Sequence, residues 1–165
     1  MPKTHVQVTD GAWQDDSDDP QSMTRRVVGA LDQHLGHSLK DKELTVRFAS
    51  DEDVRALNLE FRKKDAPTNV LSFPATAMPG QTQSEIGDII LARETVIREA
   101  GEQGKSIADH SSHLVLHGVL HLLGYDHDTD ETAEEMESLE RTVLAGLDIK
   151  DPYADETVME ADHGH

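Results

Sequence analysis

Residues 114–127 read L-V-L-H-G-V-L-H-L-L-G-Y-D-H, an apolar stretch interrupted by three histidines. The apolar residues predict a buried helix over about residues 107–123, and Gly124 is well placed to end it because glycine readily adopts the left-handed conformation of a helix C-terminus. Residues four apart lie on one face of a helix, so His117 and His121 can bind a common ion. The turn after Gly124 then brings back His127. The three histidines are therefore the predicted protein ligands of one metal ion.

Three nitrogen ligands and one vacant position are typical of catalytic zinc, whereas structural zinc usually has four protein ligands, often cysteines. The chain has no cysteine, which excludes a closed thiolate site. With ten histidines in the chain, the alternative for His117 and His121 alone is a pair of hydrogen-bonded core residues. The predicted cofactor is one zinc ion, although nickel or cobalt can bind the same nitrogens. The default reaction of such a site is hydrolysis.

The order of predicted elements around this helix indicates the fold class. Alternating and apolar segments predict strands at about 6–8, 43–49, 70–73 and 86–91, and helical periodicity predicts helices at about 21–35, 53–61, 93–102, 107–123 and 131–146. Ser50 and Asp51 offer N-cap chemistry to the second helix, in which Leu57 and Phe61 are expected to point inward. We expect an α+β fold: a single mixed sheet of about four strands, packed on one side by about five helices, with a zincin-like metal site.

The length of 165 residues fits one compact domain, over residues 1–150, followed by an acidic and disordered tail at 151–165. The formal net charge of −18 is unevenly distributed: residues 106–165 carry 2 basic and 15 acidic residues, a net of −13. This segment suits a basic protein partner better than a bare polyanion. There is no run of eighteen apolar residues and no basic-plus-apolar start, so we expect a cytoplasmic location.

The spacing of the three histidines, with glycine three residues after the second, matches the metzincin protease pattern H-E-x-x-H-x-x-G-x-x-H at all marked positions but one. Those proteases need glutamate where this chain has Gly118. The glutamate is the general base that takes a proton from water during peptide cleavage. A peptidase of this type is therefore disfavoured.

Three separate blocks together resemble the YbeY family of bacterial ribosomal-RNA maturation endoribonucleases. They are L-N-L-E-F-R-K-K-D-A-P-T-N-V-L-S-F-P at residues 57–74, E-I-G-D-I-I-L-A at 85–92 and H-G-V-L-H-L-L-G-Y-D-H at 117–127. The resemblance runs from about residue 44 to 146. It implies a cytoplasmic, zinc-dependent endonuclease specific for single-stranded RNA, acting in 3′-end processing of small-subunit ribosomal RNA, in ribosome biogenesis and in ribosome quality control. The implied partners are ribosomal RNA, the small-subunit particle and ribosomal proteins, with no membrane.

The resemblance also assigns residues. It places the zinc ligands at His117, His121 and His127 and a prominent arginine at Arg62, whose guanidinium can hold a phosphate and stabilise charge that develops there. The alternative for Arg62 is a surface arginine favoured by the helix dipole. Asp126 can orient a ligand histidine through its other ring nitrogen, or it simply forms the turn.

Three further residues are candidates for substrate binding. Lys63 and Lys64 can contact the RNA backbone, unless they are only solvated, and Ser72 lies in a family block where a strand serine is commonly structural. No residue is identifiable as the general base. Two alternatives to the nuclease remain open: a metallohydrolase of another substrate, and a ribosome-assembly factor whose metal mainly stabilises the fold.

Overall fold

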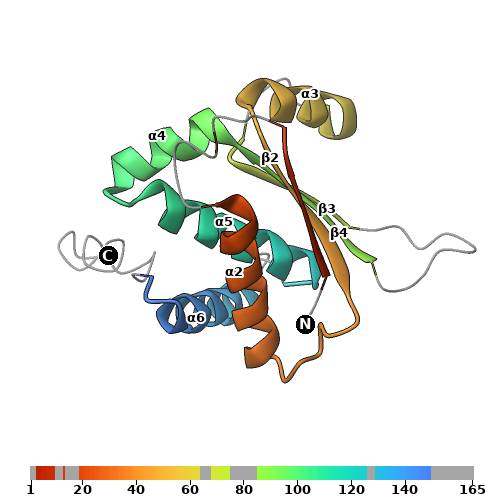
Figure 1. Ribbon diagram of the computed structural model, residues 1–165, viewed down its shortest axis with the longest axis vertical. Coiled ribbons are helices and arrows are strands. Elements are labelled where there is room, and N and C mark those ends of the chain that lie inside the picture. The colour runs from red at the N-terminus through yellow and green to blue at the C-terminus, as the bar shows by residue number, and fades with distance from the viewer. Residues whose placement is uncertain are drawn as a thin grey trace, which may run out of the picture.

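The computed structural model describes residues 3–9, 13, 19–63, 68–74, 85–125 and 129–149. Lys64, Asp126, His127 and the predicted tail at 151–165 lie outside these residues, as does the side chain of Arg62. In the described ranges the chain forms four strands and five helices, in an order that alternates at first and ends in three consecutive helices (Figure 1).

The strands form one mixed sheet. They are β1 (Lys3–Val8), β2 (Glu43–Ala49), β3 (Val70–Pro74) and β4 (Glu85–Ala92), in the spatial order β1-β2-β4-β3. β1 and β4 pair with β2 in parallel, and β3 pairs with β4 antiparallel as an edge strand. The prediction of an α+β fold with a single mixed sheet is confirmed.

The helices are α2 (Pro20–His34), α3 (Asp51–Arg62), α4 (Arg93–Gln103), α5 (Ile107–Leu122) and α6 (Asp130–Gly146). Side-chain caps explain where several of them begin: Asp19, Ser50, Ser106 and Thr129 each accept a hydrogen bond from a backbone N–H of the first turn. The bounds of every predicted element lie within three residues of the observed ones.

Within the described ranges, no helix has both the length and the apolar composition needed to cross a bilayer.

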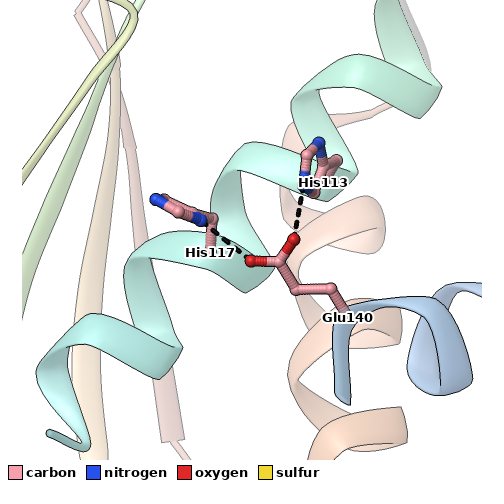
Figure 2. A group of neighbouring side chains, drawn as sticks. All are labelled: His113, His117 and Glu140. Carbon is pink, nitrogen blue, oxygen red and sulfur yellow. Dashed lines mark hydrogen bonds and ion pairs between the residues drawn. The ribbon is translucent and has the colours of Figure 1, made fainter. Parts of the chain in front are cut away.

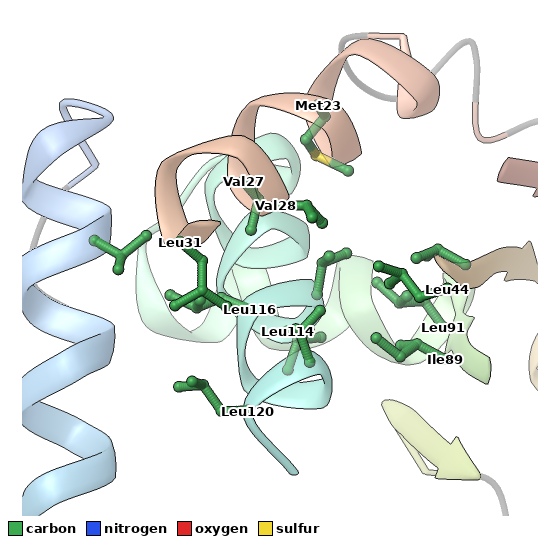
Figure 3. Close-up of a cluster of buried hydrophobic side chains, with 14 of the residues drawn as sticks. Met23, Val27, Val28, Leu31, Leu44, Ile89, Leu91, Leu114, Leu116 and Leu120 are labelled. Atoms are coloured by element: carbon green, nitrogen blue, oxygen red, sulfur yellow. The ribbon is translucent and has the colours of Figure 1, made fainter. Parts of the chain in front are cut away.

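Helix α5 occupies the centre of the main core. It packs against α2, α4 and α6 as well as against strands β3 and β4. Figure 3 shows apolar side chains of α2, α5 and the sheet meeting there, and its labels include Met23, Val27, Leu31, Leu116, Leu120, Leu44 and Ile89. Alternate residues of a strand point to opposite faces, so one face of the sheet contributes Ile89 and Leu91 to this core.

The opposite face of the sheet is also covered in part, contrary to the prediction of one-sided packing. Ile90 and Ala92 of β4 belong to a second apolar cluster, together with Val54 of α3. Leu57 packs against this cluster, as predicted. The prediction for Phe61 is wrong: this residue is 60% exposed, and its ring makes an edge contact with Phe73 at a centroid distance of 5.4 Å.

A partly buried polar cluster joins α4, α5 and the residue before β3. His110 on α5 is 3% exposed, and its Nε2 lies 2.9 Å from Glu99 Oε1, which also accepts a hydrogen bond from Asn69 Nδ2 at 2.9 Å. Among the described residues, the buried Nδ1 of His110 has no hydrogen-bond partner. Burial lowers the pKa of His110, and the contact with Glu99 opposes this effect only in part. The folded protein therefore favours neutral His110.

This shift in pKa predicts acid sensitivity. Below about pH 6.5, the ordinary pKa of histidine, the unfolded chain binds a proton at position 110 more readily than the folded chain does. The free energy of unfolding should therefore fall as the pH decreases from 6.5 toward the lowered pKa, by up to about 1.4 kcal/mol per pH unit. Urea unfolding between pH 5 and 7 should show a shallower slope for His110→Gln, whereas His34→Gln, at an exposed position of α2, should retain the parent slope. Equal slopes for His110→Gln and parent would contradict the expectation.

Candidate metal centre

Four histidines follow one face of α5. His110, His113, His117 and His121 are separated by three, four and four residues, and the ring centroids of successive members lie 6.5, 6.2 and 4.5 Å apart. This spacing follows the 3.6-residue period of the helix, which places every third or fourth side chain on the same side. The two predicted metal ligands on this helix are the closest of the successive pairs.

The ring nitrogens of His117 and His121 converge. Their Nε2 atoms lie 3.0 Å apart and the rings are nearly perpendicular, at 81°. Zinc binds histidine nitrogen at about 2.0–2.1 Å, so two nitrogens of a tetrahedral site lie about 3.3 Å apart. The observed separation is close to that value. The two nitrogens lie within hydrogen-bond distance in this structure, and a separation larger by about 0.3 Å would let both bind one ion.

The carboxylate of Glu140, which was not among the predicted site residues, contacts His117. Glu140 of α6 is 0% exposed, and its two oxygens face two different histidines: Oε1 is 2.8 Å from His117 Nδ1 and Oε2 is 2.7 Å from His113 Nε2 (Figure 2). The dashed lines in Figure 2 show the carboxylate between the two rings, while the other ring nitrogen of His117 points away from it.

The sequence did contain a signal for Glu140. Met136, Glu140, Val143 and Leu144 are the buried residues of α6, and their spacing of four, three and one places them on one helical face. A glutamate in the apolar stripe of an otherwise acidic, solvated helix indicates a buried carboxylate that needs partners. This signal is hard to recognise in the sequence, because Glu140 has many exposed acidic neighbours.

Two sets of donor atoms could hold a metal here. His113, His117 and Glu140 offer three ligand atoms within 4.8 Å of one another, and His117 and His121 offer the Nε2 pair. The distances from Glu140 to its histidines, 2.7 and 2.8 Å, are typical of charge-assisted hydrogen bonds and shorter than the roughly 3.3 Å between two ligands of one tetrahedral zinc ion. The geometry therefore favours the Nε2 pair as ligands, with Glu140 as the hydrogen-bond partner of His117.

Helix α5 ends at a glycine in the left-handed conformation. Gly124 has a φ of +100°, and backbone bonds run from Gly124 N to His121 O and from Tyr125 N to Leu120 O, each 3.0 Å long. A left-handed glycine with these bonds is a common helix stop. The predicted role of Gly124 is therefore confirmed. His127 and Asp126, the other predicted residues of this segment, follow directly but lie outside the described residues.

Gly118 is explained by packing. A Cβ atom at this position would lie 3.0 Å from Ile89 Cγ2 and 3.1 Å from Ile89 Cδ1. Position 118 thus faces the sheet in close contact with β4, whereas His117 faces α6. A glutamate here would enter the core. Close contact between helix and sheet therefore favours glycine at the position that distinguishes this chain from the metzincin pattern.

Three further predicted site residues within the described ranges lie on or next to α3 and β3. Arg62 is the last residue of α3, and exposed Lys63 follows it as the C-cap with a φ of 60°, its Nζ lying 3.5 Å from Glu60 O. Ser72 is half-buried on β3 and pairs with Ile89. Because Ile89 faces Gly118, directly paired Ser72 shares the sheet face that α5 covers. Ser72 therefore lies on the face of the sheet that α5 covers, whereas Lys63 caps the end of α3, which packs against the opposite face.

Comparison with known proteins gives concordant results. The family model described as Endoribonuclease YbeY matches residues 7–148. Proteins named Endoribonuclease YbeY from two strains of Rhodopseudomonas palustris are 45% and 43% identical to this chain, covering 94% and 98% of it and 84% and 95% of their own lengths. A protein of the same name from Bradyrhizobium diazoefficiens is 43% identical, and the match covers 94% of this chain and 87% of that protein. A Thermotoga maritima protein solved in solution is similar in fold, with a TM-score of 0.56 at 22% identity, over 87% of this chain and 91% of that one.

Proposed function

Because the chain belongs to the YbeY endoribonuclease family, we propose that it is a metal-dependent endoribonuclease that processes ribosomal RNA. More specifically, it cleaves single-stranded RNA near the 3′ end of small-subunit ribosomal RNA, on the small-subunit particle in the cytoplasm, and it contributes to ribosome quality control. The observation that carries the proposal is the convergent Nε2 pair of His117 and His121, 3.0 Å apart, within the matched region.

The ligands of the proposed zinc ion are His117, His121 and His127. All three donors are imidazole nitrogens, which zinc accepts readily, and nickel is an alternative occupant. When bound, such an ion supplies positive charge to a phosphate oxygen and makes water a better nucleophile at neutral pH. Three protein ligands leave a position for substrate or water, as hydrolysis of a phosphodiester requires.

The chain's own side chains supply the binding and orientation. Arg62 holds a phosphate oxygen pair through its planar guanidinium and stabilises the charge that develops during cleavage. Lys63 and Lys64 attract the backbone of the RNA as point charges. Ser72, on the α5 side of β3, offers a hydroxyl to the substrate, and Asp126 orients His127 by accepting its second N–H.

The proposal is tested by cleavage of labelled RNA. Zinc-loaded protein is incubated with a single-stranded oligonucleotide that reproduces the 3′ end of small-subunit ribosomal RNA, with the same sequence as a duplex, and with a casein-type peptide substrate. We expect cleavage of the single strand, loss of cleavage with a chelator, and its return with zinc. Cleavage of the peptide but not the RNA would overturn the nuclease in favour of a peptidase. Repeating the assay on small-subunit particles tests whether the assembled particle is the preferred substrate.

Arg62→Ala should lower the cleavage rate by about 10²- to 10³-fold, the usual effect of removing one group that stabilises transition-state charge. Arg62→Lys should recover only part of the rate because a lysine keeps the charge without the bidentate geometry. The matched control is Arg55→Ala, an exposed arginine two turns earlier on the same helix, which should cleave as the parent does. Zinc affinity should be the same in all three variants. Equal rates for Arg62→Ala and Arg55→Ala would remove Arg62 from the proposed mechanism.

A further inference from the structure

Glu140 is a buried carboxylate with a specific arrangement of partners. It is 0% exposed, whereas the side chains of His113 and His117 are 14% and 23% exposed. Removing an ionised carboxylate from water is costly unless its oxygens accept strong hydrogen bonds. Each oxygen of Glu140 faces one imidazole nitrogen at less than 3 Å. The arrangement therefore requires both histidines to present an N–H to the carboxylate.

This requirement determines which nitrogen of His117 carries hydrogen. A neutral imidazole has one N–H and one nitrogen with a free lone pair. Because Nδ1 of His117 faces Glu140 Oε1 at 2.8 Å, its hydrogen belongs on Nδ1 and the lone pair belongs on Nε2. Nε2 is the atom that converges with His121. The contact with Glu140 thus leaves a free lone pair on Nε2 of His117, the nitrogen that would bind the metal.

We infer that Glu140 is a positioning residue for the metal ligand His117, and that His113 holds the carboxylate in place from its other side; this inference rests on the metal site of the proposed function. Glu140 acts through two constraints. It fixes the hydrogen on Nδ1, and it fixes the rotation of the His117 ring, because both ends of the contact are set by packed helices. His113 supplies the second donor, so that the buried carboxylate has a partner on each oxygen.

A comparable glutamate–histidine pair lies farther from the proposed ligands; its carboxylate is 24% exposed, and its histidine neighbours His113. Glu99 of α4 accepts a hydrogen bond at 2.9 Å from His110, which lies two turns before His117 on the same face of α5. It is also a glutamate from a neighbouring helix, paired with a buried histidine of α5. Glu99→Gln therefore reproduces the chemical change of Glu140→Gln, and a similar perturbation of α5, away from the Nε2 pair.

The first test is zinc affinity, measured on the full chain by competition with a chelating indicator. Glu140→Gln retains the shape of the side chain but replaces one oxygen by an NH2 group, which cannot accept the hydrogen of an imidazole. We expect its zinc affinity to be about 10- to 100-fold weaker than that of the parent, the usual effect of losing the partner of a metal-bound histidine. His113→Gln should show a smaller loss, and Glu99→Gln should stay within twofold of the parent. Parent-like affinity for a folded Glu140→Gln protein would overturn the inference.

The second test needs no substitution and therefore applies even if Glu140→Gln fails to fold. Long-range proton–nitrogen NMR spectra of the ¹⁵N-labelled parent report which ring nitrogen of His117 carries hydrogen, with and without zinc. We expect hydrogen on Nδ1 in both states and zinc on Nε2. Zinc on Nδ1 of His117 would overturn the positioning role and make Glu140 itself a candidate ligand. Neither measurement uses RNA, so a parent that binds zinc but cleaves no RNA would refute the proposed function and leave this inference standing.

Discussion

His117→Ala is expected to lose zinc binding and RNA cleavage together. Loss of the partner of a metal-bound histidine already costs about 10- to 100-fold in metal affinity or activity, so loss of the ligand itself should cost at least about 100-fold in both. The variant removes one of two nitrogens that lie 3.0 Å apart, and it also leaves Glu140 Oε1 without the donor found at 2.8 Å. Zinc affinity is measured by indicator competition, and cleavage with the single-stranded substrate.

His121→Ala separates the loss of a metal ligand from the loss of a hydrogen-bond donor to Glu140. It removes the second nitrogen of the pair but leaves the contacts of Glu140 with His113 and His117 in place. It should lose zinc and activity to the same extent as His117→Ala, with a smaller loss of stability in the presence of a chelator. His34→Ala, at an exposed position of α2, is the control and should retain both properties. Full cleavage by either His117→Ala or His121→Ala would refute catalysis at this metal site.

Gly118→Glu, which completes the metzincin pattern in sequence, is expected to destabilise the protein strongly rather than to create a peptidase. The new side chain would enter the tight contact between α5 and Ile89, where even a Cβ atom would lie 3.0 Å from its neighbour. Overpacking costs about 1–3 kcal/mol, and a buried carboxylate without a partner adds several more. A total above about 3 kcal/mol is a large fraction of the 5–15 kcal/mol that stabilises a typical domain. Urea unfolding measures the loss.

The same substitution at Gly101 provides the control. Gly101 is an exposed residue of α4, and a Cβ atom there would meet nothing within 4 Å, so Gly101→Glu should change the free energy of unfolding by less than about 1 kcal/mol. Alanine variants at the same two positions give a milder comparison, because both are expected to fold. Gly101→Ala should stabilise the protein by about 0.4–1 kcal/mol, and Gly118→Ala should be less stable than Gly101→Ala. Equal gains at both positions would show that contact with Ile89 does not constrain residue 118.

Local patterns in the sequence predicted most of the fold and part of the candidate site. The strand at 43–49 was predicted at its observed bounds, since buried and half-buried residues alternate over most of its length, and the helix caps at Ser50 and Gly124 were recognisable from residue type. His117 and His121 were predicted as a pair because helix geometry alone brings residues four apart together. For His127 and Arg62, motif and spacing remain the basis of the assignment.

Interactions between distant elements could not be predicted in the same way. Phe61 was expected to be buried from its helical spacing, yet α3 covers only part of the second sheet face and leaves this ring 60% exposed. Gly118 was recognised as a departure from the protease pattern, but its cause is the side chain of Ile89, which lies 29 positions earlier in the sequence. Such contacts depend on how the elements pack, and not on the period of any one of them.

By itself, then, the sequence determined the order of the elements and the helical pairing of His117 with His121, because both follow from backbone geometry within a few residues. Only the tertiary structure placed Glu140 of α6 against His113 and His117. These partners lie 27 and 23 residues away in the sequence, too far for helix periodicity to relate them. The docking of α6 on α5 brings them together, because burying the apolar stripe around Glu140 requires its carboxylate to find hydrogen-bond donors in the core.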